Sequence, residues 1–360
     1  MNKDLHDTIV ETMFLFQETE SFQRERNSEF CATLVEACAH LNQIRKRLLI
    51  SNKAYRVAFV GLGNVGKSTL INALFGKRIA PAWNGPCTDF PIEFIHKDAA
   101  GFDVVVHSDS SGLVRQRRNF ESCEDLIDYL DELTKIDAKE KAPRRVIVKM
   151  QSDLLSNGLV VVDTPGFGAI QFGEKAGRHE EVLTDYLRKE TSQIFWVVSK
   201  AGGGIGKKEK VFYQNYLKDY CDDLIVTRAE DWKENVQARF IKLYREELES
   251  QFVNFHFVSA TQGLEARETG NDVQFTASGV KGLHDRIQRL SDESYRSEQA
   301  TRQFFDLLDN LVECTCESFS DHRGQPEWNP IRWANFERAN HASPIKRMVV
   351  EKLLRLKSCQ

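Results

Sequence analysis

The N-terminal part of the chain carries a helical pattern of apolar positions. Apolar residues recur there at steps of three and four, which places them on one side of a helix. They are Leu34, Cys38, Leu41, Ile44 and Leu48. Because residues 1–52 also contain neither Gly nor Pro, the sequence predicts one or two helices in this segment.

A second pattern begins at residue 55, where short apolar runs alternate with amphipathic segments to about residue 292. The apolar runs predict strands at 55–61, 91–96, 102–107, 144–150, 158–163, 194–199, 223–227 and 255–260. The amphipathic segments predict helices directly after the first strand and near 122–134, 177–190, 206–219, 231–250 and 280–291. This alternation indicates an α/β domain with a mostly parallel sheet and helices on both faces.

The pattern becomes helical again from residue 293, and a polar break with Gly324, Pro326 and Pro330 precedes a last basic helix near 344–357. We therefore expect three segments, which are a helical one at 1–52, the α/β domain at 53–292 and a helical one at 293–360. Packing of the two flanks on each other as a short bundle would bury both apolar stripes. Separate packing of each flank on the α/β domain is the alternative.

Composition narrows the class of protein without deciding its chemistry. With 41% hydrophobic and 28% charged residues, the chain resembles an ordinary globular protein. Its formal net charge of −4 excludes a global basic field, so we expect no nucleic-acid partner. The eight Cys include no C-x-x-C pair, and neither a secretory pattern nor an 18-residue apolar run is present. These features favour a cytoplasmic location.

The segment after the first strand matches a phosphate-binding loop. Residues 61–68 read GLGNVGKS, which fits G-x-x-x-x-G-K-[ST] between an apolar strand and a helical pattern. In such a loop, backbone N–H groups face phosphate oxygens, Lys67 reaches the β- and γ-phosphates and Ser68 ligates Mg²⁺. The predicted nucleotide-binding residues of this loop are Gly61, Gly63, Asn64, Val65, Gly66, Lys67, Ser68 and Thr69.

Two further segments supply candidates for the metal and the γ-phosphate. Asp163 ends an apolar strand in VVVDTPGFG and is expected to hold Mg²⁺ through a water, while the N–H of Gly166 senses the γ-phosphate. Thr88 is the sole hydroxyl-bearing residue between 80 and 92, and we expect it to close over the nucleotide as a Mg²⁺ ligand. A plain strand-end turn and an ordinary loop threonine are the alternatives.

A base-recognition loop is expected where the strand at 223–227 ends. Guanine is usually read by [NT]-K-x-D, whereas this chain has Thr227, Arg228, Ala229, Glu230 and then Asp231. Either Glu230 reaches the base, or the loop shifts by one residue and Asp231 does. Two residues at the end of the next strand, Ser259 and Ala260, match a loop that contacts the guanine O6.

Taken in order, GLGNVGKSTLINALFG, PCTDF, VVDTPGFG, TRAED and VSA resemble the dynamin superfamily of large GTPases, in the style of its bacterial members, over about 55–291. The 96 residues from Lys67 to Asp163 leave room for strands that small GTPases lack. The resemblance implies Mg²⁺-dependent hydrolysis of GTP to GDP and phosphate, activated when two GTPase domains pair. It assigns catalysis to Asn64, Lys67 and Thr88, because Phe167 stands where small GTPases have a water-orienting Gln.

The chain also departs from the family pattern. About 52 residues before and 68 after the domain are too few for a full helical stalk, which puts membrane remodelling in doubt. Residues 322–360 hold eight Lys or Arg against three Glu, with Trp328 and Trp333 nearby, and peripheral membrane contact is the minor reading of that segment. Rival functions are a nucleotide-gated module that recruits a protein through its helical flanks, and a P-loop protein that uses ATP.

Overall fold

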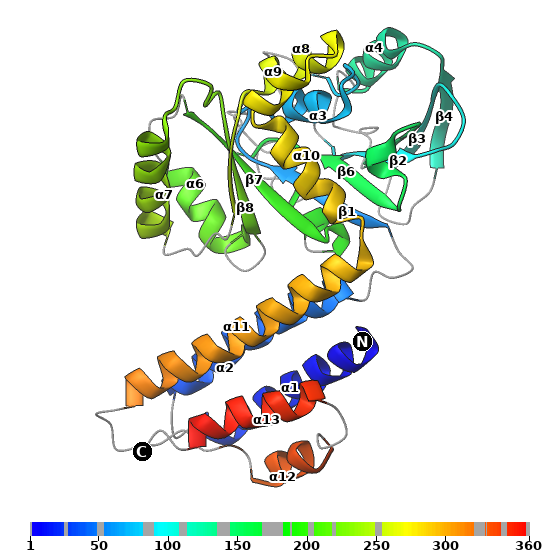
Figure 1. The fold of residues 1–360 in the computed structure, drawn as a ribbon. Helices are drawn as coiled ribbons and strands as arrows, with labels where there is room; N and C mark the ends of the chain where they lie inside the picture. Colours follow the sequence, from blue (N-terminus) through cyan, green and yellow to red (C-terminus); the bar gives the residue numbers. More distant parts are fainter. Residues whose placement is uncertain are drawn as a thin grey trace. The chain divides into compact units, whose positions relative to one another are not determined.

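A computed structural model describes most of the chain (Figure 1). The described residues are 2–24, 28–48, 54–81, 90–107, 114–134, 145–167, 183–187, 189–200, 205–217, 221–248, 254–319, 328, 330–339 and 344–357. The chain forms two compact units, one from Met1–Asn52 with Glu293–Gln360 and one from Lys53–Asp292. Within the described residues, no helix combines the length and the apolar character needed to span a bilayer.

Helices from both ends of the chain build the first unit. They are α1 (Asn2–Gln23), α2 (Ser28–Leu48), α11 (Glu293–Phe319), α12 (Pro330–Ala339) and α13 (Pro344–Lys357). One hydrophobic core joins them, in which Leu34 of α2, Phe304 of α11 and Leu353 of α13 are fully buried. The predicted bundle is therefore confirmed, because the two apolar stripes cover each other.

The two tryptophans of the C-terminal segment lie inside this core. Trp328 and Trp333 are each 4% exposed and stack with ring centroids 5.6 Å apart. Trp328 also stacks on Phe16 of α1 at 5.8 Å. Membrane contact through these two side chains is thus not available in this structure, because their rings already cover the bundle core.

The second unit contains a sheet with the order β4-β3-β5-β2-β6-β1-β7-β8-β9. Its strands are β1 (Tyr55–Val60), β2 (Ile92–His96), β3 (Phe102–His107), β4 (Val114–Phe120), β5 (Arg145–Met150), β6 (Leu159–Asp163), β7 (Gln193–Ser199), β8 (Cys221–Thr227) and β9 (Asn254–Val258). Pairing is parallel from β6 through β1, β7 and β8 to β9, and between β2 and β5. It is antiparallel at β2–β6, β3–β5 and β3–β4, so the sheet is mostly parallel.

Helices cover both faces of this sheet. They are α3 (Lys67–Phe75), α4 (Cys123–Thr134), α6 (Lys207–Phe212) with a π-turn Tyr213–Leu217, α7 (Glu234–Leu248), α8 (Ala260–Thr269), α9 (Asp272–Ala277) and α10 (Val280–Arg289), and a short 3₁₀ turn, η2, spans Asp153–Leu155. Ala58 and Val60 of β1 pack with Phe212 of α6 and Tyr244 of α7. The other face carries α3, which contacts β6, and α10, which contacts β9 and crosses in front of the sheet in Figure 1.

All eight expected strands are present, with ends that differ by about two residues at most. The strand β4 was not expected, since five of the seven residues in its sequence VRQRRNF are polar and show no apolar alternation. The short helices α8, α9 and α12 were also missed, because each is ten residues or fewer. Of the helix predicted at 177–190, residues 183–187 and 189–190 are helical, and 177–182 lie outside the described residues.

The register of the sheet brings the candidate loops to one edge. Phe59 of β1 pairs with Asp163 of β6, and Ser199 of β7 pairs with Thr227 of β8, which in turn pairs with Val258 of β9. Because these strands are parallel, their carboxyl ends and the loops that follow lie side by side. In open α/β sheets this edge is where ligands bind.

Candidate functional site

The loop between β1 and α3 has a backbone that demands glycine. At Gly66 φ is 95°, a left-handed conformation that L side chains rarely adopt. A Cβ atom on Gly61 would lie 2.2 Å from the carbonyl oxygen of Val197, so no side chain fits there. Asn64 also has a positive φ, of 61°. This backbone turns the loop tightly ahead of α3, whose first turn closes with a 2.9 Å bond from Leu70 N to Gly66 O.

Lys67 is the first residue of α3 and is 6% exposed. Its Nζ donates to the carbonyl oxygens of Gly61 at 3.0 Å and of Leu62 at 2.9 Å. The ammonium group is therefore folded over the loop, with its charge inside the ring of backbone groups. A phosphate in this loop would meet both the charge and the N-terminal end of α3.

Ser68 and Asp163 form the second part of the site. Ser68 Oγ donates a 2.7 Å hydrogen bond to Asp163 Oδ2. Asp163 is fully buried, and this burial raises the pKa of its carboxyl to about 6, although the Lys67 charge and the Ser68 bond pull it down. Among the described residues, nothing hydrogen-bonds the other oxygen, Asp163 Oδ1.

The unpartnered oxygen fits a role in metal binding. A buried carboxylate oxygen without a donor costs free energy unless a cation or water approaches it. Together with the Ser68 hydroxyl it offers the hard oxygen ligands that Mg²⁺ prefers. The described residues contain no group of three or more His, Cys, Asp or Glu arranged for a metal. Thr88, the third expected ligand, lies outside the described residues.

The DTPG segment packs directly on the phosphate loop. Phe167 N donates to Gly61 O at 3.3 Å. A Cβ atom on Gly166 would lie 2.8 Å from both Cα and N of Gly63, so the two backbones touch. Thr164 Oγ1 donates to Phe59 O at 2.6 Å and fixes the start of the segment. The N–H groups near Gly166 thus lie beside the loop, where the sequence predicts a γ-phosphate.

The side chain of Phe167 faces the protein interior. It is 2% exposed and stacks on Phe212 of α6 with centroids 3.9 Å apart and planes 5° apart. The ring belongs to the cluster that covers one face of the sheet. Phe167 therefore brings no polar group to an attacking water, as its residue type implied.

The TRAED loop is bonded to the phosphate loop. Thr227 Oγ1 donates to Val65 O at 2.6 Å and to Val198 O at 3.1 Å. Arg228 has φ of 60°, and its Nη2 donates to Asn64 O at 3.4 Å. These bonds bring the two loops together although they are separated by about 160 residues of sequence.

The two candidate base-reading carboxylates differ in their surroundings. Both Glu230 and Asp231 are exposed. Lys200, at the end of β7, donates to Asp231 Oδ1, and this bond lowers the pKa of Asp231. No described residue bonds the Glu230 carboxylate. Lys200 was not predicted as a site residue from the sequence. It could have been considered, because it directly follows an apolar strand at the same edge of the sheet.

The remaining predicted residues also lie at or near this edge. Ser259 follows β9, is 2% exposed and donates its N–H to Ser278 O at 2.8 Å. Ala260 is the first residue of α8 and is 7% exposed. Val65 is 5% exposed beside Thr227, and Thr69 lies in the first turn of α3. The structure thus places the predicted site residues that it describes in the loops at this edge of the sheet or in the helix turns that follow them, while their roles stay predictions.

Comparison with known proteins adds a family to this geometry. Residues 57–230 match the family model described as the Dynamin family. This segment is therefore similar to the dynamin family. It contains the phosphate loop, Asp163 and the TRAED loop as far as Glu230, so the predicted site lies within the matched segment except for Asp231, Ser259 and Ala260.

The chain is also similar to other known proteins. A 63-residue stretch is 49% identical to a protein named GTPase Era from Corynebacterium glutamicum, covering 17% of this chain and 20% of that protein. A solved structure titled as an oligomerised bacterial dynamin pair that senses and tethers membranes over long range aligns with 99% of this chain at 14% identity and a TM-score of 0.51. A second structure with the same title aligns at 14% identity, 99% coverage and a TM-score of 0.48. The chain spans 51% and 65% of these two structures.

Proposed function

We propose that this chain binds GTP and hydrolyses it to GDP and phosphate with Mg²⁺. The observation that carries the proposal is the bond from Ser68 to the buried Asp163 beside the folded Lys67, inside a segment similar to the dynamin family. Phosphate, hydroxyl, carboxylate and ammonium groups recur together in this way in P-loop nucleotide sites. The cytoplasmic location expected from the sequence accompanies this proposal.

The residues of the chain divide the work as follows. Lys67 balances the charge that builds up on the β- and γ-phosphates as water attacks the γ-phosphorus and the bond to the β-phosphate breaks. Ser68, Asp163 and Thr88 would hold Mg²⁺, which neutralises phosphate charge when bound. Gly166 offers its N–H to the γ-phosphate. A hydrogen bond already holds Ser68 against Asp163 before the reaction, so these two groups need little reorganisation.

We further propose that pairing of two such domains completes the site. Phe167 is buried in the hydrophobic cluster and offers no group to orient water. Asn64, by contrast, is exposed on the loop, where its φ is 61°. Asn64 can therefore meet both the phosphates and a second copy of the chain. Lone domains would hydrolyse GTP slowly.

The test is GTP turnover per molecule measured against protein concentration, with Lys67→Ala as the blank. We expect a specific activity that rises with concentration and is absent from the variant. A flat rate near that of the blank would contradict activation by dimerisation. It would favour the second candidate, a nucleotide-gated module that recruits a protein through its helices. The stacking of Phe167 on Phe212 is compatible with that candidate, because the buried ring cannot orient an attacking water.

Guanine as the base is a separate part of the proposal. A free carboxylate can accept both hydrogen bonds from guanine N1 and N2, and Glu230 is the unengaged one of the pair. Glu230→Gln should then weaken GTP binding more than Asp231→Asn does. Unlabelled ATP should not displace labelled GTP, and efficient displacement by ATP would mean that the base is adenine.

A further inference from the structure

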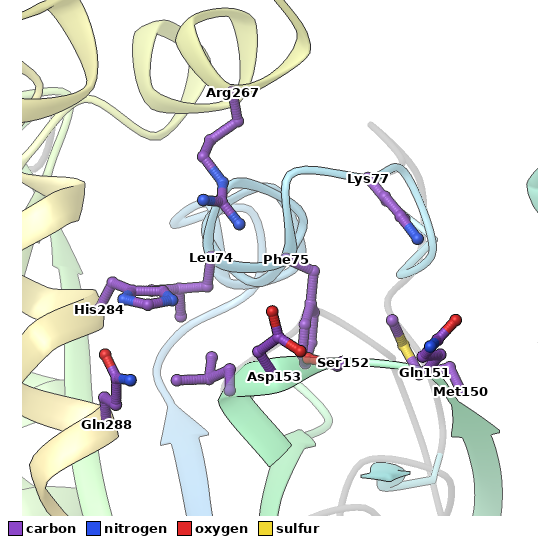
Figure 2. Close-up of a pocket in the computed structure, with 11 residues that line it drawn as sticks. Leu74, Phe75, Lys77, Met150, Gln151, Ser152, Asp153, Arg267, His284 and Gln288 are labelled. Atoms are coloured by element: carbon purple, nitrogen blue, oxygen red, sulfur yellow. The ribbon is translucent and has the colours of Figure 1, made fainter. Parts of the chain in front are cut away.

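A cavity of about 500 Å³ lies at the end of α3 that is remote from the phosphate loop. Figure 2 shows its walls, with Leu74 and Phe75 from α3, Asp153 from the turn after β5, Arg267 from α8, and two side chains from α10. Since α3 has nine residues, its two ends are about 13 Å apart. The cavity is therefore distinct from the site that holds Lys67. Its volume is in the range of small-molecule sites.

The floor of the cavity is apolar and fixed. Phe75 is 7% exposed and its ring lies 5.5 Å from that of Phe94 on β2. Leu74 and Leu154 are 0% and 4% exposed and complete the floor. These side chains are held by the core of the domain, so the floor exists before any ligand arrives. An apolar body of a ligand would cover the small parts of Phe75 and Leu154 that remain exposed, and would itself be removed from water.

The rim of the cavity carries charges that other side chains leave unbalanced. No described residue forms an ion pair with Lys77, Arg267 or Asp153, although these three line the same cavity. Arg267 packs its guanidinium over the ring of Phe275 at 5.2 Å, which orients the group without cancelling its charge. Burial and the Arg267 charge lower the pKa of His284, so its imidazole is neutral at pH 7. The rim therefore has a net positive charge.

We propose that this cavity binds a small organic anion with an apolar or aromatic body. The acid group would be held by Lys77 and Arg267, and the apolar body would lie on Phe75 and Leu154. Neutral His284 and the Gln288 amide can hydrogen-bond the rest of the ligand, as their positions in Figure 2 allow. Asp153 opposes a second acid group, so a ligand with one anionic group fits better than one with two.

Occupation of the cavity should also act on the phosphate site, a consequence that rests on the proposed function. The helix α3 carries Lys67 and Ser68 in its first turn and lines the cavity with its last turn. Asn72 fixes the segment that follows, because its Oδ1 accepts from Ile79 N at 2.8 Å and from Ala80 N at 2.7 Å. A ligand that shifts the last turn of α3 therefore shifts one rigid unit that contains the phosphate-binding residues.

Binding is tested first without nucleotide, with the fluorescent sulfonate 1-anilinonaphthalene-8-sulfonate and its uncharged analogue N-phenyl-1-naphthylamine as probes. Lys77→Gln should weaken sulfonate binding about fivefold, and Asp153→Asn should strengthen it by a similar factor. The matched control is Arg78→Gln, which removes the same charge from the neighbouring residue, outside the cavity and paired with Glu268. It should leave binding unchanged, and the uncharged probe should respond to none of the three.

Equal sulfonate binding by wild type, Lys77→Gln and Asp153→Asn would overturn the proposed site. Filling the cavity with Gln288→Trp should abolish binding, and unchanged affinity in that variant would overturn the proposal as well. Lys67→Ala should keep sulfonate binding, so a failure of nucleotide binding is recognised separately. The coupling is then measured as the change in affinity for a fluorescent GDP at saturating sulfonate. No change in wild type would refute the link through α3.

Discussion

Ser68 Oγ and Asp163 Oδ2 lie 2.7 Å apart although the two residues are separated by 95 positions. The bond joins the first turn of α3 to the end of β6 and leaves the other Asp163 oxygen without a donor among the described residues. The chain therefore places a buried, incompletely hydrogen-bonded carboxylate beside its phosphate loop. Such a group is costly for the folded state and useful for binding a cation.

Asp163→Asn should stabilise the metal-free protein and abolish GTP turnover. Burial raises the pKa of Asp163 to about 6, so the folded state disfavours its charge at pH 7. An amide has no such charge and can still accept from Ser68, so unfolding should require on the order of 2 kcal/mol more free energy. Urea unfolding at pH 7.5 with EDTA measures this gain. A less stable variant would show that the buried carboxylate does not lower the stability of the folded state.

Gly166→Ala should remove nucleotide binding while the fold persists. Its Cβ would meet Gly63 at 2.8 Å, which pushes the DTPG segment away from the phosphate loop. The matched control is Gly282→Ala on α10, where a Cβ meets nothing within 4 Å. The control should gain up to about 1 kcal/mol in stability and keep its affinity for nucleotide. Titration with a fluorescent GTP analogue compares the two, and equal affinities would contradict the close approach.

Phe167→Ala should destabilise the domain by about 3 kcal/mol. The change removes a buried ring that stacks at 3.9 Å on Phe212, and the surroundings cannot fill the space completely. Phe14→Ala is the control, since that ring is 48% exposed in the helical unit and its loss should matter little. Thermal unfolding of both variants tests the difference. Similar small shifts for both would mean that the Phe167 ring contributes no packing.

Asp223→Asn should make the free energy of unfolding fall less steeply as the pH is lowered. Asp223 is buried on β8 and accepts bonds from Gln193, His256 and Arg286. The bond from His256 and the Arg286 charge outweigh burial and lower the pKa of Asp223 below its ordinary value of 3.8. The ionised group thus stabilises the folded state above pH 3.8, and this contribution is lost as the pH falls through the lowered pKa. Unfolding free energies from pH 7 down to about 3 would show a shallower fall in the variant.

Much of the fold follows from local sequence. Eight strands and most helices were predicted because the period of apolar residues depends only on local backbone geometry. The edge strand β4 was not predicted, because most of its residues are exposed and show no apolar period. The bundle was predicted only as one of two packings, because an apolar stripe shows that a partner exists without showing which one.

The sequence alone determined the phosphate loop, since Gly61, Gly66 and Lys67 follow a local pattern that chemistry imposes. Tertiary structure decided which distant groups meet that loop. The pairing of Phe59 with Asp163 brings the carboxylate to Ser68, and the packing of the whole domain raises its pKa. Distances across a sheet and burial depend on the register of strands far apart in the chain, which no local pattern encodes.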